Sequence, residues 1–161
     1  MRLVVLLILF ITLMFSDGDP CQSRWHNNAY NVFQNRHILR FQFDRHSPNA
    51  WENYLTRTNL CGRKLIQSFV RKDDELRIRK ICTRRGFRYR DNLCISSKRV
   101  KVYFVNSTLN NGHCHVHHLS YRSKYVIVAC ENVANICLPV HYHGQTFTPP
   151  PRGGKTCVPR A

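Results

Sequence analysis

Histidine and basic side chains are the groups in this sequence best suited to chemistry. The 161 residues include nine histidines and 25 lysines and arginines, against nine aspartates and glutamates. Acids are scarce, three of the nine cluster at Asp73, Asp74 and Glu75, and no Gly-x-Ser-x-Gly motif is present, so carboxylate-pair and Ser–His hydrolase chemistry are not indicated. Histidine titrates near neutrality and can serve as general base or general acid. The composition therefore favours acid–base work on a phosphodiester.

Three segments combine such residues with aromatic or apolar neighbours. They are residues 33–37 (FQNRH), residues 64–69 (KLIQSF) and residues 139–142 (PVHY). In the first, Phe33 and His37 lie four residues apart and share one face of a helix. The second begins three residues after Cys61, and the third lies near the end of the chain.

The first half of the chain predicts short helices. A helix is expected over residues 30–40, and Pro48 should stop anything helical before a second helix over residues 51–60. Residues 65–70 read as a strand, and residues 73–81 as a charged helix.

The second half is rich in strands. The expected strands cover residues 100–105, 114–117, 125–130 and 138–142, with a turn at residues 110–112. Early helices followed by an antiparallel sheet make the predicted fold class α+β.

In order and context, the three segments resemble the pancreatic ribonuclease (RNase A) superfamily. Its members carry Phe-x-x-x-His on a helix, then Cys-Lys-x-x-Asn-Thr-Phe, then Pro-Val-His-Phe. Residues 127–131 also look like the family strand that precedes the last motif, and the resemblance covers residues 30–144. It implies a secreted, vertebrate-type or angiogenin-like member with short N-terminal helices packed on a bent, disulfide-stapled antiparallel sheet.

The resemblance also implies three catalytic roles. His37 matches the general base that removes the ribose 2′-OH proton, and His141 matches the general acid that protonates the departing 5′-oxygen. Lys64 matches the cation that stabilises the anionic phosphorane. The product would be a 2′,3′-cyclic phosphate, formed without metal or cofactor. His46 is an alternative base, although its spacing from the preceding phenylalanine is one residue short.

Base recognition carries over as well. Ser68 stands where the family has a threonine that reads a pyrimidine, and Tyr142 matches an aromatic that packs on the base. Cleavage of single-stranded RNA 3′ to pyrimidines is therefore expected. The other expected substrate-binding residues are Arg36, Gln67, Phe69 and Glu131.

Two departures from the family pattern keep an alternative function open. Gly62 and Arg63 intervene before Lys64, which is still preferred because it preserves the spacing to the following motif. His143 replaces an aspartate that orients the acid histidine, which should weaken control of its tautomer. The alternative is a catalytically weak or inactive cationic protein that binds polyanions, with a host-defence, antimicrobial or angiogenin-like signalling role.

The ends of the chain predict a secreted protein. The apolar run over residues 3–15 is 13 residues long, shorter than the roughly 20 needed to cross a bilayer, and follows Met1-Arg2. No stable transmembrane span is expected. The predicted organisation is a signal peptide (1–17), an N-terminal extension (18–29), an RNase A-like domain (30–145) and a Pro/Gly-rich tail (146–161) anchored by Cys157.

Secretion predicts that the eight cysteines are paired. Spacing alone leaves 105 pairings open. The family resemblance implies Cys61–Cys114 and Cys82–Cys130. For the remaining four we expect Cys137–Cys157, which would tie down the tail, and Cys21–Cys94.

The net charge of +16 favours polyanionic partners. Nine lysines and arginines lie in residues 71–90, which could contact RNA, heparan-type glycosaminoglycan or anionic membranes, or form a solvated face. Asn106 begins an N-glycosylation sequon. The alternating histidines at 113, 115 and 117 could chelate a metal, but an exposed polar strand is expected. The protein is expected to be a monomer.

Overall fold

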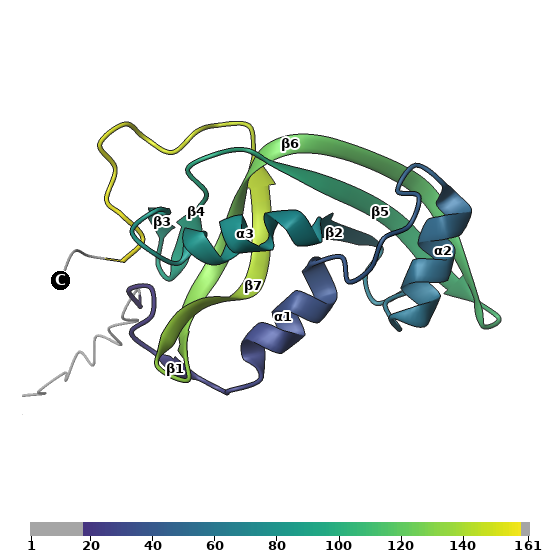
Figure 1. Ribbon diagram of the computed structural model, residues 1–161, viewed down its shortest axis with the longest axis horizontal. Coiled ribbons are helices and arrows are strands. Elements are labelled where there is room, and N and C mark those ends of the chain that lie inside the picture. Colours follow the sequence, from purple (N-terminus) through teal and green to yellow (C-terminus); the bar gives the residue numbers. More distant parts are fainter. Residues whose placement is uncertain (1–17, 159–161) are drawn as a thin grey trace, which may run out of the picture.

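The computed structural model describes residues 18–158, and the predicted signal peptide over residues 1–17 lies outside the described residues (Figure 1). The described chain contains three α-helices and a short 3-10 turn, η1, which directly precedes the third helix. The helical elements are α1 (Ala29–His37), α2 (Pro48–Arg57), η1 (Lys72–Asp74) and α3 (Glu75–Ile81). The strands are β1 (Arg24–Trp25), β2 (Ile66–Val70), β3 (Phe87–Arg90), β4 (Leu93–Ile95), β5 (Val100–Asn110), β6 (His113–Val133) and β7 (Ile136–Thr146).

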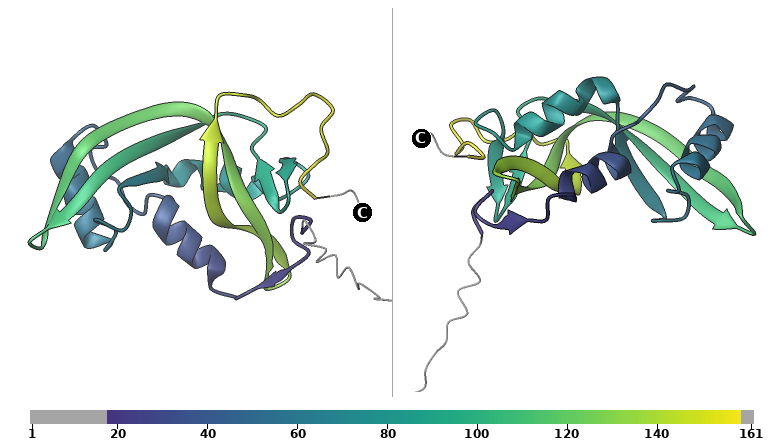
Figure 2. Two further views of the ribbon diagram at one scale, coloured as in Figure 1. Left: turned by 180° about the vertical axis from the view of Figure 1, so that it is seen from behind. Right: turned by 60° about the horizontal axis from the view of Figure 1, so that its bottom comes forward.

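The long strand β6 organises the sheet. Its first half pairs antiparallel with β5, and its second half pairs with β4 on one side and β7 on the other. β2 extends the sheet beyond β5, and β3 extends it beyond β4. Seen from behind, α1 lies beside β7 while the β5–β6 hairpin curves away towards α2 (Figure 2). The predicted α+β class, with short helices on a bent antiparallel sheet held by disulfides, is confirmed, apart from a short parallel pairing of β1 with β6.

Each arm of the bent sheet has its own apolar core. Beneath α2, the side chains of Trp51, Tyr54 and Phe69 are fully buried against the β2–β5 arm. Beneath α1 and α3, Phe33 and Ile78 pack against the second half of β6 and against β7. Full burial of such side chains contributes roughly 1.5–3 kcal/mol each, so each core stabilises its own arm of the sheet.

The ends of α1 and α2 follow from local chemistry. α1 stops at His37 because Ile38 is extended and forms a bridge with Val70 on β2, so the helix is shorter than predicted. The sequence suggested that Pro48 stops a helix, but Pro48 lies in the first turn of one. It starts α2, where its missing N–H costs nothing, and the Ser47 hydroxyl caps the helix by accepting a hydrogen bond from Ala50 N at 3.3 Å.

Two disulfides follow the pairing that the family resemblance implies. Cys61 is bonded to Cys114, which ties the segment after α2 to the start of β6. Cys82 is bonded to Cys130, which ties the end of α3 to the second half of β6.

The other two disulfides differ from the expected pairs Cys137–Cys157 and Cys21–Cys94, and those expectations are wrong. The backbone N–H of Cys21 bonds to β6, which places it beside Cys137 at the start of β7. The tail returns along β3, where it brings Cys157 to Cys94 on the neighbouring strand β4. Spacing could not reveal this arrangement because it depends on how both chain ends fold back onto the sheet.

Candidate active site

His37 lies where the end of α1 meets β2. Its Nδ1 atom is 3.0 Å from the backbone carbonyl oxygen of Ser68. Because a carbonyl oxygen can only accept a hydrogen bond, Nδ1 must carry the hydrogen. In the neutral ring this leaves the lone pair on Nε2, which is the form that a general base requires.

The surroundings of His37 keep its ring neutral. The ring stacks on Tyr142 with centroids 5.0 Å apart, and the Phe33 ring lies 5.4 Å away. Burial, together with the nearby positive charges of Arg63, His141 and Lys64, lowers the pKa of His37 to about 4. The hydrogen bond to Ser68 partly opposes this shift.

His141 and Lys64 belong to the same electrostatic cluster. His141 lies on β7 opposite Ala129, and register shifts in the β6–β7 pairing lie on both sides of the residue pair 141–142. Such bulges re-aim side chains. Burial lowers the pKa of His141, and so do the charges of Lys64, His143 and Arg36. The fold thus gathers the three predicted catalytic residues from α1, the segment before β2, and β7.

A cleft of about 190 Å³ lies between β2 and β7. His141 and Arg36 do not line it. The charge of Lys64, which does line it, lowers the pKa of His141, and so does the charge of Arg36. Ser68 is half-buried on the cleft wall. The residues that line the cleft are His37, Arg63, Lys64, Ile66, Gln67, Ser68, Tyr142, His143, Gly144 and Gln145.

Tyr142 forms an aromatic wall of this cleft. Its hydroxyl donates a hydrogen bond to Gln145 Oε1 at 2.8 Å. Burial raises the pKa of this phenol, which outweighs the opposing effect of a hydrogen bond with the Ser68 side chain. Tyr142 is buried, with its ring stacked on His37, so the phenol stays neutral beside the Ser68 hydroxyl.

Arg63 is a site residue that the family motifs did not assign. Gln67 is buried and donates from Nε2 to the carbonyl oxygen of Leu60 at 2.7 Å. The same amide accepts a hydrogen bond from Arg63 Nε at 3.1 Å. The guanidinium group is thereby fixed on the cleft wall, while its buried Nη2 has no hydrogen-bond partner among the described residues. Gln67 thus positions Arg63 and has little capacity left for substrate.

Besides Arg36, two expected substrate-binding residues do not line the cleft. Phe69 is fully buried and packs with its ring centroid 5.3 Å from that of Trp51, in the core below α2. Glu131 is also buried, and its Oε1 accepts a hydrogen bond from Asn92 in the turn between β3 and β4. Both side chains are engaged within the protein.

The remaining histidine alternatives do not join the cluster. His46 lies against Tyr121, with ring centroids 5.6 Å apart, and does not line the cleft. On the β5–β6 hairpin, His117 Nε2 is 2.7 Å from Thr108 Oγ1. Within residues 18–158, the one trio with metal-ligand spacing consists of cysteines 94, 130 and 157, which are all disulfide-bonded.

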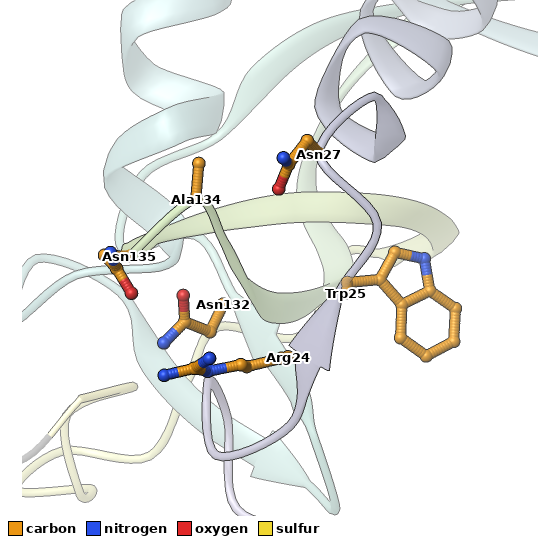
Figure 3. A pocket seen from close by; sticks show the side chains of 6 residues that line it. All are labelled: Arg24, Trp25, Asn27, Asn132, Ala134 and Asn135. Atoms are coloured by element: carbon orange, nitrogen blue, oxygen red, sulfur yellow. The ribbon is translucent and has the colours of Figure 1, made fainter.

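A larger pocket lies away from this chemistry, where β1 meets the β6–β7 turn (Figure 3). Its volume is about 330 Å³, and Arg24, Asn132 and Asn135 turn towards one another while Trp25 points away. It contains no acid–base pair. The residues that line it are Arg24, Trp25, Asn27, Asn132, Ala134 and Asn135.

Comparison with known proteins supports a ribonuclease-type function. No protein-family model and no curated protein sequence matches the chain. Among solved structures, SS-RNase-2 des116-120 is 28% identical over 74% of this chain and 100% of its own, with a TM-score of 0.55. Green turtle egg white ribonuclease is 19% identical over 73% of this chain and 98% of its own, with a TM-score of 0.57.

In the part of the chain that the structure describes, no helix is long and apolar enough to cross a membrane. Four disulfides suit an extracellular protein. With three helices on a bent antiparallel sheet, and with ribonucleases as structural neighbours, the chain is a member of the RNase A-like superfamily.

Proposed function

We propose that this protein is a secreted endoribonuclease that cleaves single-stranded RNA on the 3′ side of pyrimidines. One observation carries the proposal. His37, Lys64 and His141 come from three distant parts of the chain, yet the charge of Lys64 lowers the pKa of each histidine. A base, an acid and a cation whose charges interact suit phosphodiester cleavage.

The proposed reaction begins with proton transfer from the ribose 2′-OH to Nε2 of His37. The 2′-oxygen forms a bond to phosphorus as the bond from phosphorus to the 5′-oxygen breaks. His141 donates its proton to that departing oxygen, and Lys64 stabilises the negative charge on the phosphorane. The products are a 2′,3′-cyclic phosphate and a free 5′-hydroxyl. Water then opens the cyclic phosphate with the histidine roles reversed.

The substrate supplies its own nucleophile in this scheme. DNA lacks the 2′-OH and should not react. Ser68 and Tyr142 would hold the pyrimidine on the 5′ side of the scissile phosphate, the hydroxyl by hydrogen bonding and the ring by stacking. Arg36 would contribute positive charge next to His141.

We further propose that the chain is exported, with residues 1–17 as the removed signal peptide, and acts as a monomer. Residues 18–29 would form an extension, residues 30–145 the catalytic domain, and residues 146–161 a tail attached through Cys157. The disulfide from Cys157 to Cys94 supports this role of the tail.

A dinucleotide assay tests the proposal. The disulfide-bonded protein and its His141→Ala variant are compared on fluorogenic UpA, CpA and ApA substrates. Cleavage of UpA and CpA by the parent, lost in the variant, is the expected result. A folded parent without cleavage would favour the non-enzymatic, polyanion-binding alternative. Cleavage retained by His141→Ala would show that the acid is misassigned.

A further inference from the structure

A second groove, of about 450 Å³, lies at the C-terminal end of α3. Its walls come from α3, the turn between α3 and β3, and the connection from β4 to β5. Figure 1 shows this region at the far end of α3 from β2. The groove shares no lining residue with the catalytic cleft. The lining residues that the argument uses are Arg77, Lys80, Arg84, Arg85, Phe87 and Lys98.

The groove is strongly positive. Five of its lining residues are lysine or arginine, and none is acidic. Arg77 is paired with Asp74 at 3.1 Å, whereas the other four cations form no ion pair within residues 18–158. Four uncompensated charges around one hollow attract anions, and binding a polyanion there releases condensed counterions.

The floor of the groove is apolar and rigid. Ile81 and Val100 are buried beneath it, and the Phe87 side chain remains partly exposed. The Ser96 hydroxyl fixes the β4–β5 connection, because it donates to the carbonyl oxygen of Lys98 at 2.8 Å and accepts from Val126 N at 3.0 Å. The site is therefore built before any ligand arrives.

We propose that this groove binds a segment of single-stranded RNA at a distance from the cleft. Phosphates match the four free cations, and the flat face of a base matches the apolar floor with its partly exposed phenylalanine. A sulfated polysaccharide matches the charge but has no aromatic face to place on that floor. The inference rests on the proposed function in taking RNA as the polymer.

A distal RNA site predicts a dependence on chain length. The cleft and the groove share no lining residue, so cleavage of a dinucleotide bound in the cleft should be independent of the groove cations. A longer RNA that occupies both sites is held by two linked contacts, which raises its apparent affinity. The groove should therefore lower KM for polymeric RNA without changing turnover of UpA.

The test replaces Lys80, Arg84, Arg85 and Lys98 together with glutamine. A matched control variant replaces four exposed arginines outside the groove and the cleft with glutamine, which removes the same net charge. The control positions are Arg40, Arg57, Arg90 and Arg152. Binding of a labelled 20-nucleotide RNA is measured by fluorescence anisotropy from 50 to 300 mM salt, with His141→Ala added to both variants to prevent cleavage.

Loss of four phosphate contacts on a single strand should make the slope of log affinity against log salt shallower by about 2.8. At 0.15 M salt this corresponds to a loss of affinity of roughly 10²-fold. The control variant should lose much less. Equal losses in both variants would overturn the proposal, as would a groove variant that loses retention on heparin but keeps its affinity for RNA. Binding is read without catalysis, so the result stands apart from the UpA assay. Circular dichroism confirms that each variant is folded.

Discussion

The proposed catalytic pair should work best in mildly acidic solution. Catalysis requires neutral His37 and protonated His141 at the same time. Burial lowers the pKa of His37 from 6.5 to about 4, and burial with the charge of Lys64 lowers the pKa of His141 from the same starting value. The profile of kcat/KM against pH should therefore be bell-shaped, with its acid limb near pH 4 and its alkaline limb below pH 6.5.

The size of the effect at neutral pH follows from His141. A histidine with a pKa of 6.5 is protonated in about a quarter of molecules at pH 7, and the lowered pKa leaves a smaller fraction. We therefore expect kcat/KM at pH 7 to be less than about a quarter of its maximum, and to fall roughly tenfold per further pH unit. Two unperturbed imidazoles would instead centre the optimum at pH 6.5.

Initial rates on UpA from pH 3.5 to 8.5, at constant ionic strength and low substrate concentration, measure this profile. Arg63 provides an internal check because its charge lowers the pKa of His37. Arg63→Gln should move the acid limb to higher pH, whereas Arg63→Lys keeps the charge and should leave the limb in place. A parent acid limb near pH 6, or a limb unmoved by Arg63→Gln, would refute the reasoning.

Four further predictions concern the cation, the base, the tail and the sequon. Lys64→Gln should lower kcat/KM on UpA by about 10²–10³-fold through loss of transition-state stabilisation, as steady-state kinetics would show. Because the pKa of His37 is lower in the folded state, the stability that this residue contributes is complete above pH 6.5 and is lost as the pH falls to about 4. The loss should be roughly 3 kcal/mol of unfolding free energy. Urea titrations at both pH values should show this loss, which should disappear in His37→Phe. Replacing Cys94 and Cys157 together by alanine should cost about 2–5 kcal/mol of unfolding free energy, measured by the same titration, because it removes a bridge across 63 residues. Peptide mapping after glycosidase treatment should place an N-glycan at Asn106. Asn106 lines a groove together with Ile66, and Ile66 also lines the cleft. Removal of the glycan should therefore speed cleavage of polymeric RNA more than cleavage of UpA.

The sequence allowed the fold class to be predicted, and three candidate catalytic residues to be proposed, because local patterns and the family motifs point to both. Phe33 and His37 share a helix face, and the motifs around Lys64 and His141 keep their order along the chain. The structure brings these residues into one electrostatic cluster. The short strands β1, β3 and β4 were not anticipated, because two to four residues carry too little periodicity to distinguish a strand from a loop.

Side-chain orientation set the limit for the substrate-binding residues. Gln67, Phe69 and Glu131 were assigned by position in a motif, and position does not reveal which face of a strand a side chain occupies. Phe69 turns into the core beneath α2, and Glu131 is held by Asn92. Arg63 was passed over because it lies in an insertion before the lysine, and its anchor on Gln67 forms only in the folded chain.

The positive charge of this protein has opposite effects on substrate attraction and on base strength. Arg36, Arg63, Lys64 and His143 would draw a phosphodiester into the cleft, yet the same charges lower the pKa values of the two histidines. A bound phosphate supplies negative charge among these groups and should raise both pKa values. His37 then becomes a stronger base, and His141 a better protonated acid, only once substrate is present. The profile of kcat should for this reason lie at higher pH than that of kcat/KM, because the first reports the enzyme–substrate complex and the second the free enzyme.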